Sequence, residues 1–322
     1  MPESPFRAAV VQHSPVFLDL SQSVEKACVL VEQAARGGAK LIAFPETWLP
    51  GYPVWLDFAP NAALWDYGPA KELYAQLWDN SITLDGPHVA ALAACAERND
   101  CVLVMGAHER LGGTLYNTML YFDGARGLAG VHRKLMPTYT ERLVWGMGDG
   151  STLTVVDSGV GRVGGLICWE HWMPLARAAM HDRNELVHVA QWPMVKEMNL
   201  VASRHYAFEG QCFVLACGAV LTRRQMLAGA GKPNAVLDSV PGADADFIHR
   251  GGSAIIAPTG DLLAGPLWDE EQILMADIHP ALAVQGRMLL DVNGHYSRPD
   301  VFRLEVNQSA QKSVVSREEP CE

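Results

Sequence analysis

Short apolar runs alternate with amphipathic stretches along most of this chain, and the alternation restricts the folds that it can adopt. Residues 40–44 read Lys-Leu-Ile-Ala-Phe and predict a strand buried on both faces, as in a sheet covered by helices. Residues 23–36 predict a helix whose apolar face carries Val24, Ala27, Val31 and Ala34. Repetition of this strand and helix order is typical of an α/β domain.

The same order of elements continues toward the C-terminus. Further strands are predicted at 7–11, 101–107, 186–190 and 213–218, and further helices at 87–99, 174–182 and 196–210. Hairpins are predicted at Asp123-Gly124, at 158–161, and between strands 253–257 and 273–278 through the turn 258–261. No repeat or linker interrupts the pattern. The sequence therefore predicts a single catalytic domain over residues 1–304 and a polar tail over residues 305–322.

The charge balance excludes several classes of partner. The chain has 322 residues, a formal net charge of -11 and a pI of about 5.4, so it offers no basic surface for nucleic acid. No apolar run approaches the roughly 20 residues needed to span a bilayer. The N-terminus also lacks the charged and apolar regions of a secretory signal. These features predict a soluble, cytoplasmic protein that does not bind membranes.

Three short motifs each place a reactive side chain at the end of an apolar run. Glu46 ends Phe-Pro-Glu, Lys134 lies in His-Arg-Lys-Leu, and Cys168 begins Cys-Trp-Glu after Gly-Gly-Leu-Ile. A carboxylate, an ammonium and a thiol delivered from strand ends indicate nucleophilic catalysis by an activated cysteine. A nearby ammonium favours the thiolate, and a glutamate can accept the thiol proton and return it to the substrate. The seven cysteines include no Cys-x-x-Cys pair, which argues against a zinc site or a disulfide framework.

The joint order of these motifs resembles the nitrilase superfamily of carbon–nitrogen hydrolases, and Cys-Trp-Glu-His at 168–171 resembles its nitrilase branch. Further matches are Gly51-Tyr52-Pro53, the stretch 137–142 and the stretch 294–300, so the resemblance extends from about residue 7 to about residue 302. It implies a four-layer αββα sandwich. It also implies a reaction that needs no metal and no organic cofactor.

The resemblance implies a reaction path as well. Cys168 attacks the nitrile carbon to form a thioimidate, Glu46 relays protons, and hydrolysis proceeds through a thioester to the carboxylic acid and ammonia. Lys134 and the backbone N–H of Trp169 stabilise the developing negative charge. A second glutamate of the family matches Glu141 and is expected to orient the lysine and the substrate.

Several neighbouring residues are candidates for supporting roles. His132 shares a strand face with Lys134, Glu170 is placed to accept backbone N–H bonds of the nucleophile loop, and His171 is expected to support the helix entry after Cys168. Each also has a purely structural reading. Aromatic residues near the three motifs predict an apolar pocket wall that favours aromatic or arylaliphatic nitriles, formed by Tyr52, Trp55, Trp145, Trp169 and Trp192.

Two other functions remain open from the sequence. One is an amidase or carbamoyl-amino-acid hydrolase on the same fold, against which Trp169-Glu170 argues. The other is a catalytically silent assembly protein, against which the complete set of Glu46, Lys134 and Cys168 argues. The charged fraction of 19% and the apolar stretch 51–64 predict surface that awaits a partner. By resemblance, we expect a homodimer that extends into a helical oligomer.

Overall fold

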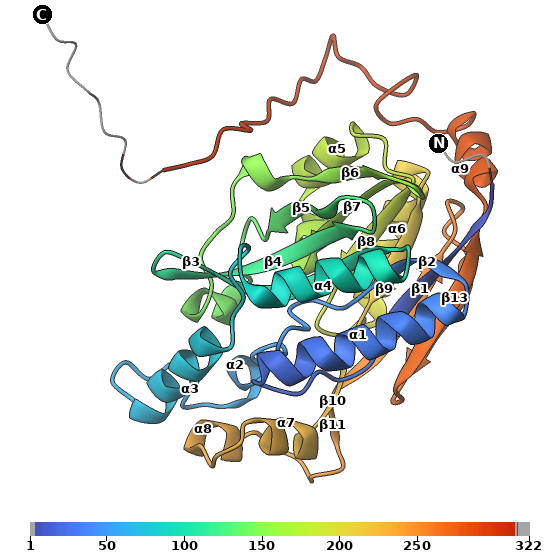
Figure 1. The fold of residues 1–322 in the computed structure, drawn as a ribbon. Coiled ribbons are helices and arrows are strands. Elements are labelled where there is room, and N and C mark those ends of the chain that lie inside the picture. Colours follow the sequence, from blue (N-terminus) through green and yellow to red (C-terminus); the bar gives the residue numbers. More distant parts are fainter. Residues whose placement is uncertain (1–3, 313, 315–322) are drawn as a thin grey trace, which may run out of the picture.

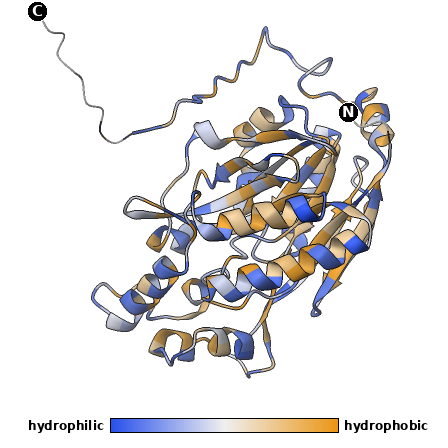
Figure 2. Cartoon of the chain, in the orientation of Figure 1, coloured by the Kyte–Doolittle hydropathy of each residue, from blue (hydrophilic) through white to orange (hydrophobic). Residues whose placement is uncertain are grey.

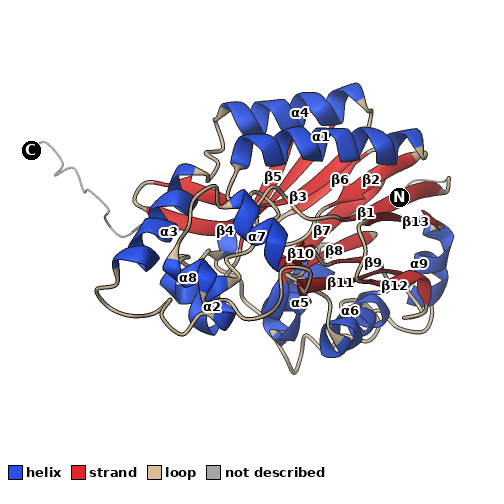
Figure 3. Ribbon diagram, turned by 90° about the horizontal axis from the view of Figure 1, so that it is seen from below, coloured by secondary structure: helices blue, strands red, loops and turns tan. Residues whose placement is uncertain are grey.

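Two β-sheets stacked face to face form the centre of the molecule, and helices cover both outer faces (Figures 1 and 3). The computed structural model describes residues 4–312 and 314. The six-stranded sheet has the order β13 (Gln272–Ile278), β1 (Phe6–Gln12), β2 (Ala39–Ala43), β3 (Val102–Leu111), β4 (Thr114–Asp123) and β5 (Gly127–Arg133). The seven-stranded sheet has the order β10 (Val220–Thr222), β11 (Phe247–Ile256), β9 (Phe213–Cys217), β8 (Val187–Gln191), β7 (Gly161–Ile167) and β6 (Val155–Ser158), with β12 (Leu262–Trp268) paired to β11.

The helices complete the four layers that the family resemblance implied. The six-stranded sheet is covered by α1 (Leu20–Arg36) and α4 (Pro87–Arg98), and the seven-stranded sheet by α5 (Pro174–His181) and α6 (Glu197–Gly210). Smaller helices lie at one end of the sandwich and at the C-terminal side: α2 (Trp55–Phe58), α3 (Gly68–Asp79), α7 (Arg223–Gly229), α8 (Ala235–Asp238) and α9 (Pro280–Arg287). No helix in the described part of the chain combines the length and apolarity that crossing a bilayer requires.

The apolar patterning explains why these layers form. Strands β1 to β3 are parallel, as are β7 to β9, and they carry the predominantly hydrophobic sequence of strands buried on both faces (Figure 2). The helix α1 begins at Asp19, whose carboxylate accepts the N–H of Gln22 at 2.9 Å, and its apolar face packs on the sheet. The strands predicted at 7–11, 40–44, 101–107, 186–190 and 213–218 and the four predicted helices are confirmed to within a few residues at each end.

The hairpin predicted between 253–257 and 273–278 is wrong. The turn at 258–261 leads from β11 into β12, while β13 pairs antiparallel with β1 in the other sheet. The sequence concealed β12 because it is largely exposed and contains Gly265-Pro266, which breaks the strand pattern. A proline is compatible with β12 because this strand pairs only with β11 and so lies at an edge.

The apolar stretch 51–64 was expected at the surface, but its first part, residues 51–56, is buried. Its apolar residues form a third hydrophobic cluster with α3, α7 and α8, which includes Tyr52, Val54, Trp55 and Leu56. Only Phe58 and Leu64 among its large apolar side chains are exposed. This stretch therefore closes one end of the sandwich within the chain.

The stretch after α9 contains neither helix nor strand through residue 312. Part of it returns to the domain, where the N–H of Gln311 donates to the Asp149 carboxylate at 2.7 Å. The predicted tail at 305–322 lies partly outside the described residues, as does Cys321.

Close backbone packing at Gly106 ties the fold to the loop that carries Glu46. A Cβ atom at Gly106 in β3 would lie 2.2 Å from the carbonyl oxygen of Pro45 and 2.6 Å from the nitrogen of Thr47. We predict that Gly106→Ala lowers the free energy of unfolding by about 1–3 kcal/mol, because the overpacked strand must push this loop away. Urea unfolding measures the change. The control is Gly113→Ala in the β3–β4 turn, where a Cβ meets nothing within 4 Å; equal stability of the two variants would contradict the prediction.

Candidate active site

Three chain segments from the two sheets deliver the predicted reactive groups to one buried place. Glu46 follows β2, Lys134 follows β5, and Cys168 follows β7 as the first residue of the 3₁₀ turn η3 (Cys168–Trp172). All three side chains are buried. The carboxyl ends of β2 and β7 meet at the same edge of the sandwich, since side-chain atoms of Glu46 and Cys168 lie within 4.8 Å of each other; ligand sites of α/β sheets occur at such edges.

The ammonium of Lys134 lies between two carboxylates. Its Nζ donates to Glu46 Oε1 at 2.8 Å and to Glu141 Oε2 at 2.7 Å. Asn117 also donates to Glu46 Oε1, at 2.6 Å, and Tyr52 donates its hydroxyl to Glu141 Oε1 at 2.9 Å. The other oxygen of Glu46, Oε2, is buried and has no hydrogen-bond partner among the described residues. That oxygen is therefore the free proton acceptor of the cluster.

Glu141 owes its position to a short turn. The 3₁₀ turn η1 (Tyr139–Leu143) begins with a capping box in which the Glu141 carboxylate accepts the N–H of Thr138 at 2.6 Å. The same carboxylate oxygen accepts from Lys134. The structure thus brings Glu141 to the cluster, as the family resemblance implied, and it does so through a local turn motif.

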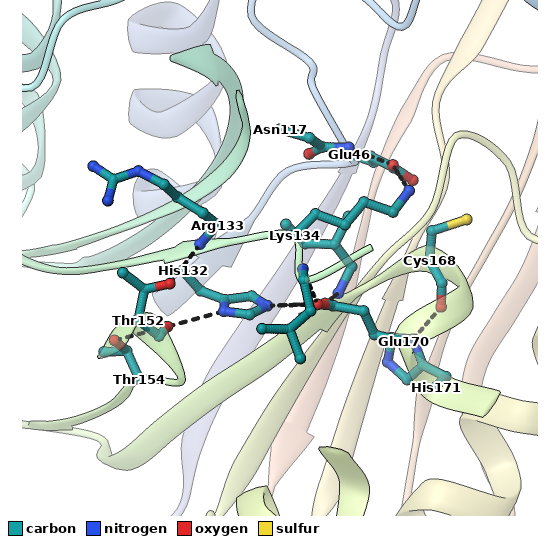
Figure 4. A network of polar contacts seen from close by, with 12 residues as sticks. Glu46, Asn117, His132, Arg133, Lys134, Thr152, Thr154, Cys168, Glu170 and His171 are labelled. Atoms are coloured by element: carbon teal, nitrogen blue, oxygen red, sulfur yellow. Dashed lines mark hydrogen bonds and ion pairs between the residues drawn. The ribbon is translucent and has the colours of Figure 1, made fainter. Parts of the chain in front are cut away.

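The loop that carries the thiol is held by Glu170 (Figure 4). Its two carboxylate oxygens accept the N–H of Ile167 at 2.6 Å and the N–H of Leu135 at 2.7 Å. Cys168 itself has a φ of +55°, in the left-handed region that residues with a side chain seldom adopt. Glu170 therefore joins the segment after Lys134 to the strained residue that carries the sulfur.

His132 completes this arrangement as a buried cation. Its Nδ1 lies 2.9 Å from the carbonyl oxygen of Thr152 and its Nε2 lies 2.8 Å from Glu170 Oε2. Both oxygens can only accept, so both ring nitrogens carry protons. Burial alone would lower the pKa of His132, but the Glu170 carboxylate raises it, and His132 in turn holds the pKa of Glu170 low against the effect of burial. His132 therefore acts on the site through Glu170.

Burial dominates the acid–base properties of the cluster. Burial and then the charge of Glu46 raise the pKa of the Cys168 thiol, although Lys134 and the N–H of Trp169 oppose the shift. Burial raises the pKa of Glu46 to about 7, with Lys134 lowering it and Glu141 raising it. The sequence suggested that Lys134 would favour the thiolate; the structure shows this contribution outweighed in the free protein. The surroundings therefore favour the protonated thiol of Cys168.

The donor atoms of Glu46, Glu141 and Cys168 lie within 4.8 Å of one another, a spacing that also suits metal ions. The ammonium of Lys134 already bonds both carboxylates and supplies the positive charge there. A cation bound to the same oxygens would have to displace it, so the donor set fits the lysine better than a metal.

The five aromatic residues predicted to bind substrate lie in different places. Tyr52 bonds Glu141, and the ring of Trp145 lies 5.7 Å from Lys134 Nζ, so both belong to the cluster. The ring of Trp55 packs on Phe17 instead. Trp169 is 57% exposed, and only its backbone faces the sulfur. The ring of Trp192 is buried and stacks on His171, and its backbone carbonyl accepts the N–H of Glu46 at 3.4 Å.

Asn117 is a site residue that the sequence analysis missed. It lies in β4 within an otherwise ordinary strand, opposite His108, and its only distinguishing feature is a polar side chain in a buried position. A buried amide in an apolar strand needs a hydrogen-bond partner. A polar amide within a strand expected to be buried was therefore the sequence feature that could have identified Asn117. In the structure its partner is Glu46.

Comparison with known proteins agrees with this geometry. The family model described as carbon-nitrogen hydrolase matches residues 7–288. The chain belongs to the carbon–nitrogen hydrolase family. It is 42% identical over 310 residues to a nitrilase, blr3397, of Bradyrhizobium diazoefficiens, covering 96% of this chain and 94% of the relative. It is 41% identical to an aliphatic nitrilase of Sinorhizobium fredii, covering 97% and 99%.

Solved structures confirm the fold of this carbon–nitrogen hydrolase. The crystal structure of a carbon-nitrogen hydrolase from Helicobacter pylori superposes with a TM-score of 0.69 at 20% sequence identity, covering 89% of this chain and 93% of that one. The αββα sandwich is therefore shared across a large sequence distance.

The raised pKa of Glu46 leads to a prediction about pH. We expect kcat/KM to fall as pH drops through about 7, because a protonated Glu46 cannot accept the thiol proton. The titration belongs to the cluster as a whole. Glu141→Gln removes a charge that raises the pKa of Glu46, so the acid limb should move to lower pH. Glu25→Gln on the exposed face of α1 is the control. An acid limb near pH 4 in the unmodified enzyme would contradict the prediction.

Proposed function

We propose that this chain is a nitrilase, which hydrolyses an organic nitrile to the carboxylic acid and ammonia. The observation that supports this most directly is the buried cluster in which Glu46, Lys134 and Glu141 surround the Cys168 sulfur. Relatives that are named nitrilases match almost the full length of the chain. The cluster offers the nucleophile, the proton acceptor and the fixed positive charge that addition to a carbon–nitrogen multiple bond requires.

The first half of the reaction forms a covalent intermediate. Cys168 attacks the nitrile carbon as its thiol proton passes to Glu46, and this proton then reaches the nitrile nitrogen to give a thioimidate. Oε2 of Glu46 is suited to this transfer because it has no other partner. The ammonium of Lys134 and the N–H of Trp169 stabilise the negative charge that develops on the substrate nitrogen.

The second half consumes two water molecules. The first water adds to the thioimidate with Glu46 as base, and the resulting tetrahedral intermediate expels ammonia to leave a thioester. The second water attacks the thioester, releases the carboxylic acid and returns the proton to Cys168. Glu141 and Tyr52 keep Lys134 in place throughout by the hydrogen bonds described above.

We further propose that aromatic or arylaliphatic nitriles are preferred. Tyr52 and Trp145 stand at an interplanar angle of 66° with ring centroids 5.8 Å apart, next to Glu141 and Lys134. Favourable ring pairs contribute roughly 0.5–1.5 kcal/mol beyond area burial. Of the five aromatic residues expected to bind substrate, Tyr52 and Trp145 lie beside the charged cluster. The relative from Sinorhizobium fredii is named an aliphatic nitrilase, so short alkyl nitriles are the alternative to compare.

Replacing the nucleophile tests the proposal. Cys168→Ala should lower kcat for ammonia release by at least about a thousandfold, because the attacking atom is lost. Cys28→Ala in α1, away from the cluster, is the control and should keep the unmodified rate. Ammonia release is measured with phenylacetonitrile, benzonitrile, a short alkyl nitrile and the corresponding amides. Turnover of the amides alone would indicate an amidase.

The same panel tests substrate preference. The ratio of kcat/KM for phenylacetonitrile to that for the alkyl nitrile should exceed one, and Trp145→Leu should reduce it because the variant removes one ring beside Lys134. A higher value for the alkyl nitrile would overturn the preference and leave the nitrilase proposal intact.

We also propose that residues 1–304 form the catalytic domain of a homo-oligomer, with 305–322 as a tail that helps to join its subunits. The turn η3 packs on α5 and α6, and together they expose a group of large apolar side chains. These are Trp169, Leu175, Met198, Val201 and Phe208. An exposed apolar face of this kind is typical of a protein–protein interface.

Sedimentation velocity tests the assembly. The chain should sediment as a dimer or a larger helical oligomer rather than as a 35.1 kDa monomer. Leu175→Glu should weaken association, since it places a charge on the apolar face. Leu111→Glu, exposed at the β3–β4 turn, is the matched control. A concentration-independent monomer would contradict the proposal.

A further inference from the structure

A second chain of buried polar residues lies behind the nucleophile loop, on the side away from Lys134. It runs from the backbone of Cys168 through His171 and His188 to Glu185, and Tyr206 of α6 closes it. The four side chains are at most 2% exposed. The reaction described above uses none of them, although a buried polar chain of this length requires a complete set of donors and acceptors.

The hydrogen bonds fix the direction of each proton. His171 Nδ1 lies 2.7 Å from the carbonyl oxygen of Cys168, and this oxygen can only accept, so Nδ1 carries the proton. His171 Nε2 lies 3.0 Å from His188 Nε2, and one of these two nitrogens must donate to the other. With His171 neutral, the donor is His188 Nε2.

The remaining nitrogen of His188 decides the state of Glu185. His188 Nδ1 lies 2.9 Å from Glu185 Oε1. A neutral His188 that donates through Nε2 has a bare Nδ1, which only a protonated carboxyl group can meet with a hydrogen. The hydroxyl of Tyr206 donates to the other oxygen, Glu185 Oε2, at 2.6 Å. Every donor and acceptor in the chain is then satisfied without any charge.

We propose that Glu185, as a neutral carboxylic acid, and His188 are positioning residues: they fix the ring of His171, which bonds the carbonyl of Cys168, and so orient the nucleophile. This inference rests on the proposed role of Cys168. The carbonyl belongs to the residue with the left-handed φ, and the next N–H, that of Trp169, faces the sulfur. A peptide anchored at its oxygen cannot rotate, so the N–H stays directed at the place where charge develops.

The surroundings suit a neutral chain. Burial raises the pKa of Glu185 to about 8, lowers the pKa of His171 to about 3, and lowers that of His188 well below its usual value. The carboxyl group fits against β7 at Gly164, where a Cβ atom would lie 2.0 Å from Glu185 Oε1. Tyr206, His181 and Arg183 lower the pKa of Glu185 but do not offset burial. His181 is itself bonded to Glu209, which also pairs with Arg177 at 2.7 Å.

The alternative is an ionised pair, with a carboxylate on Glu185 and an imidazolium on His188. The two forms respond differently to Glu185→Gln. A glutamine donates one N–H to His188 Nδ1 and accepts from Tyr206 with its oxygen, so it reproduces the neutral acid. It cannot reproduce a carboxylate, because imidazolium Nδ1–H would meet an amide that has lost its charge.

The first experiment compares Glu185→Leu with Glu185→Gln. Leucine should lower kcat for nitrile hydrolysis at least tenfold with KM little changed. It breaks the hydrogen-bonded chain through His188 and His171 that holds the carbonyl of Cys168, and it does not touch the substrate. Glutamine should recover most of this loss. The rate of Cys168 alkylation by iodoacetamide should follow kcat in all three proteins. Equal kcat values for the two variants, whether both high or both low, would overturn the inference.

The control for charge is Glu109→Gln. Glu109 is equally buried, but Arg133 bonds it through two nitrogens at 2.7 and 2.6 Å, so it is a carboxylate. The melting temperature should fall in Glu109→Gln and stay near that of the unmodified protein in Glu185→Gln. A similar fall in both would indicate that Glu185 is ionised and would overturn the proposal.

Infrared difference spectroscopy detects whether the Glu185 carboxyl group is protonated in the unmodified protein. At neutral pH, subtracting the spectrum of Glu185→Gln should leave the carbonyl band of a protonated carboxylic acid; a carboxylate band in its place would refute the neutral chain. The alkylation, melting and infrared measurements need no nitrile. If the protein released no ammonia from any nitrile, the proposed function would fail while these three measurements would still decide the state and the role of Glu185.

Discussion

The buried ammonium of Lys134 is the constraint on which the site depends. Removing an ammonium from water is costly unless opposite charges and hydrogen bonds surround it, and here Glu46 and Glu141 supply both. Each carboxylate is in turn fixed by a neutral donor, Asn117 for Glu46 and Tyr52 for Glu141. The two carboxylates and one ammonium leave one excess negative charge beside the thiol. Burial of the thiol, and after it the charge of Glu46, raises the pKa of Cys168 against the opposing effect of Lys134.

Around this charged cluster the protein places two different kinds of support. On one side His132 and Glu170 form an ionised pair that reaches the backbone on both sides of the site. On the other side Glu185 and His188 form the uncharged chain. Charged support near Lys134 is compatible with a region already rich in charge. Uncharged support behind the thiol adds no further negative charge to a sulfur that must become an anion.

The sequence was most informative where the chemistry follows a strand. Glu46 and Cys168 end apolar runs, so their positions at one edge of the sandwich followed from the pattern, and the motifs around Lys134 and Glu141 followed from the family resemblance. The sequence was least informative about pairing between distant strands, as β12 and β13 show, because an exposed edge strand carries no apolar alternation.

Side-chain orientation was the second limit. Tryptophans near a motif in sequence, such as Trp55 and Trp192, pack on partners that the local sequence does not reveal: Trp55 on Phe17 and Trp192 on His171. Asn117 and Glu185 lie in stretches that read as ordinary strand or turn, and their importance depends on partners more than 15 residues away in the chain or on another element. Such contacts are tertiary, so a local sequence pattern does not predict them.

The attachment of Glu170 to Leu135 and Ile167 has a consequence for how this architecture can change. One carboxylate spans the two sheets and sets the separation of the lysine and cysteine segments directly, by hydrogen bonds, instead of through the many apolar contacts between the sheets. The interior between the sheets is therefore free to exchange one apolar residue for another without altering the spacing of the reactive groups. Sequences can therefore differ widely in the core while the lysine and cysteine segments keep their separation, provided that Glu170 is kept.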